Sequence, residues 1–217
     1  MNNNNCADNF VFINPIEKIV FMLVPGNSHD NFKKYLLTNK WQPLSKFDSQ
    51  IISTSKKIIV LKDPYERWLE GFCNLVNTRN KNFNLPDSFI KLYKSEYQTE
   101  SLELFFKYAT TFEFDLYTQP QIKFLETCVS KNYNDENSTY FFINEKIGFD
   151  INKYLQKFKI FTLLNNSVCK LSQEILEDYK IIKDFLDNYP ELRQRVITFL
   201  SPDYKFISSI NFYNVEK

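Results

Sequence analysis

The sequence predicts an α/β domain in which helices flank a central, mainly parallel sheet. Two uninterrupted apolar runs, KIVFMLV at residues 18–24 and KIIVL at residues 57–61, are typical of strands that are buried on both faces. Each run is followed by turn residues and then by a segment that suits a helix. Strands that alternate with helices favour a parallel sheet, since parallel strands need a crossover between them.

The composition is that of a globular protein and excludes several classes. Hydrophobic residues make up 43% and charged residues 24% of the 217 positions, enough for one domain with a substantial core. The 27 basic and 26 acidic side chains nearly cancel, which argues against a general nucleic-acid binder. We expect a mobile tail at residues 1–9, where asparagine repeats, and a single domain at residues 10–217.

The remaining elements are predicted in order along the chain. Residues 30–38 suit a helix after the first strand, and residues 41–55 are polar and irregular. The Asp63-Pro64 pair opens a helix that could run to residue 77. Further on, the sequence predicts a helical segment in two pieces at 87–110 and a loop that leads into a helix at 115–127. It also predicts short strands at 139–143 and 160–164, and a helical stretch at 171–200 that breaks near Tyr189-Pro190.

Neither a metal site nor a membrane segment is expected. The four cysteines are far apart and His29 is the single histidine, a set that does not match the close spacing of zinc ligands. Free thiols are the simpler interpretation, although the sequence leaves a disulfide open. We expect a soluble, cytoplasmic protein with no membrane partner, because no apolar run of about 18 residues and no signal-peptide pattern is present.

The turn after the second apolar run carries the clearest chemical signal. Asp63, Pro64 and Glu66 have a sufficient structural role, as N-cap, first helical residue and capping-box partner. Lys62 and Arg67 have no such explanation. In parallel sheets, ligands bind at the carboxyl ends of strands, where helix N-termini favour anions. Two cations beside a helix start therefore predict an anion site.

The motif K-D-P-Y-E-R-W-L-E-G-F at residues 62–72 resembles the 3′-phosphate-binding segment of sulfotransferases, R-D-P-x-x-R-x-x-S-x-Y. Residues 24–32 occupy the place of the family's loop for the 5′-phosphosulfate. Residues 115–125, DLYTQPQIKFL, are similar to the D-x-H-x-x-P-Q-x-x-F-L element of the carbohydrate-sulfating branch. Residues 140–155 and 190–204 are similar to its later strand and closing helix, so the resemblance extends over residues 18–206.

This resemblance implies a three-layer, P-loop-like fold and a co-substrate, 3′-phosphoadenosine 5′-phosphosulfate (PAPS), with no metal. The acceptor would be a hydroxyl group of a carbohydrate or small molecule. The resemblance assigns nucleotide binding to a loop and two cations: Gly26, Asn27, Ser28, Lys62 and Arg67. His29 and Glu145 are the candidate bases. A lone histidine is more often structural, and an acid at the end of a strand can equally cap the next turn.

The sequence departs from the family pattern at three positions. Gly26 replaces the loop lysine, Glu70 the serine for the 3′-phosphate, and Tyr117 the histidine of the D-x-H element. If the carboxylate of Glu70 lay about 4 Å from the 3′-phosphate, it would repel the phosphate by roughly 4 kcal/mol at an effective dielectric near 20. Two hypotheses therefore stand: an active sulfotransferase, and a catalytically inactive protein of the same fold that serves as a binding or assembly module. A P-loop kinase is disfavoured, since no G-x-x-x-x-G-K-[ST] motif occurs.

Overall fold

The computed structural model describes residues 10–27, 29–44, 49–76, 110, 116–126, 133–161, 164 and 173–213. By its contacts the chain divides into two compact units. Unit 1 comprises Met1–Asp63, Gln121–Lys170 and Ile207–Lys217, and unit 2 comprises Pro64–Pro120 and Leu171–Phe206. The tail expected at 1–9 and nearly all of the helical segment expected at 87–110 lie outside the described residues.

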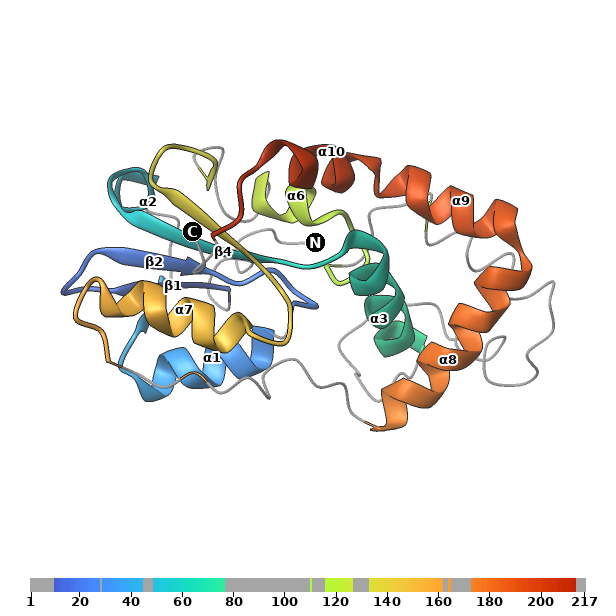
Figure 1. Cartoon of the computed structure of the whole chain (residues 1–217), viewed down its shortest axis with the longest axis horizontal. Coiled ribbons are helices and arrows are strands. Elements are labelled where there is room, and N and C mark those ends of the chain that lie inside the picture. Colours follow the sequence, from blue (N-terminus) through green and yellow to red (C-terminus); the bar gives the residue numbers. More distant parts are fainter. Residues whose placement is uncertain are drawn as a thin grey trace. The chain divides into compact units, whose positions relative to one another are not determined.

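Unit 1 is built on a five-stranded sheet with the order β3-β1-β2-β4-β5 (Figure 1). β2 pairs with β4 and β4 with β5 in parallel, whereas β1 pairs antiparallel with both β2 and β3. The sheet is therefore mixed, and the prediction of a mainly parallel sheet was wrong. The strands are β1 (Val11–Asn14), β2 (Ile19–Met22), β3 (Gln42–Pro43), β4 (Lys56–Leu61) and β5 (Ser138–Phe142).

The antiparallel part of the sheet comes from a hairpin that the sequence analysis did not predict. Asn14, the last residue of β1, accepts hydrogen bonds through Oδ1 from the backbone nitrogens of Ile16 and Glu17, both at 3.1 Å. Such an asparagine turn reverses the chain without help from glycine. It sets Phe12 opposite Phe21, so both strands place apolar side chains on the same faces.

The two predicted central strands are confirmed as adjacent and parallel. Every residue of β2 is buried, and so are five of the six residues of β4. The ring centroids of Phe21 in β2 and Phe32 in α1 (His29–Thr38) are 5.6 Å apart. Those of Phe141 in β5 and Tyr154 in α7 (Ile147–Gln156) are also 5.6 Å apart. By register these side chains share one face, which α1 and α7 therefore cover (Figure 1).

A buried lysine marks the other face of β4. Lys57 has no exposed side-chain surface, and its Nζ donates to Asp135 Oδ2 at 2.6 Å and to the carbonyl of Ser55 at 3.3 Å. A buried charge is tolerated only when it is paired in this way. The ion pair ties the start of β4 to the turn before β5.

The outer edge of β5 is covered by the end of the described chain. Phe212 forms a parallel bridge with Tyr140, and the backbone nitrogen of Tyr213 donates to the carbonyl of Tyr140 at 2.8 Å. The strand predicted at residues 160–164 was wrong for the residues that the structure describes there. Leu164 instead exchanges two hydrogen bonds with the side chain of Asn152 in α7, at 2.9 and 3.0 Å.

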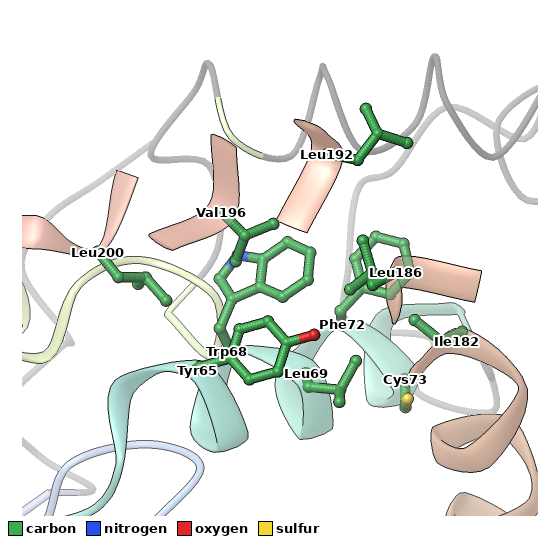
Figure 2. Close-up of a cluster of buried hydrophobic side chains, with 10 residues drawn as sticks. All are labelled: Tyr65, Trp68, Leu69, Phe72, Cys73, Ile182, Leu186, Leu192, Val196 and Leu200. Atoms are coloured by element: carbon green, nitrogen blue, oxygen red, sulfur yellow. The ribbon is translucent and has the colours of Figure 1, made fainter. Parts of the chain in front are cut away.

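Unit 2 is a helical cluster around α3 (Pro64–Val76), α8 (Gln173–Asn188) and α9 (Pro190–Phe199). The predicted break at residues 189–190 is confirmed, with Pro190 opening α9. Trp68 stacks on Phe72 at 5.0 Å, and Figure 2 shows the apolar side chains of α9 gathered above those of α3. The buried cluster consists of Tyr65, Trp68, Leu69, Phe72, Cys73, Ile182, Leu186, Leu192, Val196 and Leu200.

Short helices complete the described chain: α2 (Ser49–Thr54) and α6 (Gln121–Phe124) in unit 1, and α10 (Ser201–Ser209), which crosses from unit 2 into unit 1. Residues 41–55 are thus more regular than predicted, because they contain both β3 and α2. In the part of the chain that the structure describes, every helix is too short or too polar to cross a membrane.

Candidate functional site

Three parallel strands end at one edge of the sheet in unit 1. The register pairs Met22 of β2 with Ile59, and Leu61 of β4 with Phe142 of β5. The backbone nitrogen of Ile143 then donates to the carbonyl of Leu61 at 2.8 Å. The chain that leaves these strands supplies residues 25–27, 62, 63 and 143–146, which we call the carboxyl edge. Most of the predicted site residues therefore lie on neighbouring strand ends.

The loop after β2 is a tight turn. The backbone nitrogen of Asn27 donates to the carbonyl of Val24 at 3.1 Å, and Gly26 has a φ of 84°. Proline followed by a residue with positive φ is the pattern of a type II turn, in which glycine is strongly preferred at the second position. This geometry explains the glycine at position 26. The turn carries no charge at that position.

The buried side chain of Asn27 links the loop after β2 to β4 and α6. It is 1% exposed, and its Nδ2 donates to the carbonyl of Val60 at 3.0 Å and to Gln121 Oε1 at 2.7 Å. Its Oδ1 is buried and has no hydrogen-bond partner in the described part of the chain. The side-chain amide of Asn27 is therefore engaged with β4 and α6.

Lys62 directly follows β4 and is partly exposed. Its backbone nitrogen donates to Gln121 Oε1 at 3.1 Å, and its carbonyl accepts from Gln121 Nε2 at 2.8 Å. The backbone of Lys62 is thus fixed at the end of a central strand, with the cationic side chain starting from the carboxyl edge. This is the placement that the sequence predicted.

Of the two candidate bases, Glu145 belongs to the carboxyl edge, and His29 follows the loop after β2. His29 is the first residue of α1, but its side chain and all of Ser28 lie outside the described residues. Asp30, in the first turn of α1, is exposed and interacts favourably with the helix dipole. Glu145 is exposed between β5 and α7. Its neighbour Asn144 makes the turn bond, accepting from the backbone nitrogen of Lys146 at 2.7 Å.

Arg67 belongs to α3 in unit 2 and serves the fold. The residue is fully buried, and its two terminal nitrogens donate to the carbonyls of Gln119 and Leu116, both at 2.7 Å. A Cβ on Gly71, one turn further along α3, would lie 2.4 Å from the carbonyl oxygen of Tyr117. The helix backbone therefore packs directly on the segment 116–119, and Arg67 fastens that segment.

Glu70 lies near α8. It is 8% exposed. Burial is the largest cause of the raised pKa of Tyr179, and the charge of Glu70 raises this pKa further. The Tyr179 hydroxyl donates to Glu66 Oε2, which raises the same pKa further. The two carboxylates, one turn apart on α3, thus both interact with Tyr179.

One residue that the sequence analysis did not select is Gln121. It is 1% exposed and bonds to both Asn27 and Lys62. The available signal was its place in the P-Q pair of the 115–125 element, together with the rule that a buried amide needs partners.

Comparison with family models, curated proteins and solved structures found no match for this chain. The resemblance to sulfotransferases therefore depends on the residues themselves and on the order of the motifs. In the structure, the segments 24–32, 62–72 and 115–125 are linked by hydrogen bonds of Gln121 to Asn27 and Lys62.

Proposed function

We propose that this chain is a sulfotransferase-like protein that binds PAPS at the carboxyl edge and transfers its sulfuryl group to a hydroxyl of a carbohydrate or small molecule. The observation that supports this most is the meeting of β2, β4 and β5, whose parallel ends carry Gly26, Lys62 and Glu145. Ligand sites of α/β proteins lie at such strand ends.

The residues present at the edge fit the nucleotide at the end of β4. Lys62 is a partly exposed cation with a fixed backbone, suited to a phosphate group. The dipole of α1, which begins at His29, is favourable for an anion near the N-terminus of the helix. Gly26 supplies no charge, and the buried Arg67 serves α3 instead. Of the two cations predicted to bind the nucleotide, Lys62 is therefore the one that lies at the edge.

The chemistry requires little covalent participation from the protein. Transfer breaks the bond between sulfur and a phosphate oxygen and forms a bond between sulfur and the acceptor oxygen, whose proton passes to a base. Glu145 is the exposed carboxylate at the edge that can take this proton, with His29 as the other candidate. Positioning and electrostatic stabilisation supply the remaining rate enhancement.

The test is the melting temperature in the presence of the product nucleotide, adenosine 3′,5′-bisphosphate. A ligand at a hundredfold excess over its dissociation constant adds about 2.7 kcal/mol, which raises the melting temperature by roughly 5–10 °C in a protein of this size. Lys62→Ala should remove most of this shift, whereas Lys153→Ala, an exposed lysine of α7, should retain it. Absence of any shift at millimolar nucleotide contradicts the proposal.

A second candidate is a catalytically inactive protein of the same fold that acts as a binding or assembly module. Two observations favour it: Arg67 is committed to backbone carbonyls, and the turn at Gly26 leaves the loop without its lysine. The two candidates differ in turnover. Nucleotide binding without sulfuryl transfer to a panel of sugars and phenols supports the inactive protein, and transfer abolished by Glu145→Gln supports the enzyme.

A further inference from the structure

Gln121 joins segments that lie far apart in the sequence. Its side chain connects the loop after β2, the end of β4 and the start of α6 through three hydrogen bonds of 2.7–3.1 Å. Asn27 adds a fourth bond, from its Nδ2 to the carbonyl of Val60 at 3.0 Å. We call these four bonds around Gln121 and Asn27 the amide clamp.

The orientation of both amides is determined by their partners. Lys62 offers one donor and one acceptor, so Gln121 Oε1 must face the Lys62 nitrogen and Nε2 the Lys62 carbonyl. The Asn27 Nδ2 must then face Gln121 Oε1 and the Val60 carbonyl, since both are acceptors. Turning either amide would set like groups against each other in a buried site. The clamp therefore has one arrangement.

We propose that Gln121 is a positioning residue for the nucleotide: it fixes the backbone from which Lys62 extends and holds the loop after β2 beside it. This inference rests on the proposed function and deepens it. A bound phosphate needs its cation at a defined distance, and small displacements of a supporting residue weaken a site. Gln121 is buried and acts through Lys62 without contact with the ligand.

The test compares affinities for adenosine 3′,5′-bisphosphate by titration calorimetry. We expect Gln121→Ala and the isosteric Gln121→Glu each to weaken binding about tenfold, within the range of coupling between neighbouring groups. In a Lys62→Ala background, Gln121→Ala should change the affinity less than twofold, because the residue it positions is gone. Gln156→Ala, an exposed glutamine at the end of α7, is the matched control and should bind as the wild type does.

Amide hydrogen exchange tests the clamp without the nucleotide. In Gln121→Ala, the amide of Lys62 should exchange faster while that of Ile59 in β4 stays protected; unchanged protection of Lys62 overturns the inference. The inference is also overturned if both Gln121 variants bind the nucleotide with the affinity of the wild type. It is likewise overturned if the losses of affinity from Gln121→Ala and Lys62→Ala simply add in the double variant. No binding by the wild type contradicts the proposed function itself, so the two failures are distinguishable.

Discussion

At the scale of single residues, two buried polar side chains, Tyr65 and Lys57, affect the stability of the fold for different reasons. Tyr65 is 7% exposed, and its hydroxyl has no hydrogen-bond partner in the described part of the chain. Burial raises its pKa from 10.0 to about 12. Lys57, by contrast, is fully buried and satisfied by its ion pair with Asp135. Burial thus disfavours ionisation of Tyr65, whereas the charge of Lys57 is balanced by the carboxylate of Asp135.

The first prediction concerns Tyr65 at high pH. The unfolded state releases this proton near pH 10 and the folded state only near pH 12, so the stabilising contribution is complete below pH 10 and is lost between pH 10 and 12. Tyr65→Phe should make the fall of the unfolding free energy over this window less steep. At pH 7 the variant should be equally stable or up to about 1 kcal/mol more stable, because it loses no hydrogen bond.

Urea denaturation at pH 7, 10 and 11.5 measures this effect. Tyr189→Phe, a partly exposed tyrosine between α8 and α9, is the control and should fall with pH as the wild type does. An alkaline slope that Tyr65→Phe leaves unaltered would mean that Tyr65 ionises at its ordinary pKa in the folded protein.

The second prediction concerns the buried ion pair. Asp135→Asn keeps an oxygen for the turn bonds to Asn137 and Ser138 but leaves Lys57 charged and unpaired, which should cost about 3–5 kcal/mol. Lys57→Met removes the buried charge itself and should cost clearly less, because Asp135 keeps 31% exposed side-chain surface. Chemical denaturation of both variants gives the comparison. A larger loss for Lys57→Met than for Asp135→Asn would contradict this explanation.

At the scale of elements, the sequence predicted the long apolar and strongly periodic segments well. β2, β4 and the α8–α9 break were found because continuous hydrophobic runs and a proline determine them locally. β1 was missed because four residues carry too little pattern, and its pairing with β2 and β3 is what makes it a strand. The strand expected at 160–164 is absent at the residues described there, 160, 161 and 164, and the backbone groups of Leu164 bond to Asn152 of α7 instead.

The candidate site was predictable in part for the same reason. Once two strands are known to be parallel, their carboxyl ends lie on one edge. The positions of Lys62 and Glu145 there could be expected from the parallel pairing of β4 with β5. The commitments of Asn27 and Arg67 could not, because their partners lie 94 and 52 residues away in the chain. No local pattern reports such contacts.

The third prediction concerns the contact between α3 and the segment 116–119. A methyl group at position 71 would lie 2.4 Å from the Tyr117 carbonyl oxygen and 2.8 Å from its carbon, both backbone atoms. Helix propensity alone predicts that Gly71→Ala stabilises α3 by about 1 kcal/mol. We expect the clash to reverse this sign, with a loss of about 1–3 kcal/mol. Thermal or urea unfolding decides it, and a stabilised variant would show that α3 does not pack closely on this segment.

At the scale of the whole molecule, the chain combines a mixed sheet in unit 1 with a helical cluster in unit 2, and each has its own buried core. The proposed function belongs to unit 1, because Gly26, Asn27, Lys62, Gln121 and Glu145 all lie there. The clamp residues bond to the carbonyl of Val60 in β4 and to that of Lys62, directly after the strand. The proposed site and the fold therefore share hydrogen bonds at the end of that strand.

The most direct measurement is hydrogen–deuterium exchange of the wild-type protein with and without adenosine 3′,5′-bisphosphate, read at short exchange times. Binding at the three strand ends predicts added protection in peptides that contain residues 25–30, 61–64 and 143–147. The opposite ends of the same strands, at residues 15–18 and 135–137, should be unaffected. Protection that appears at those opposite ends, or that spares all three carboxyl ends, would contradict the account.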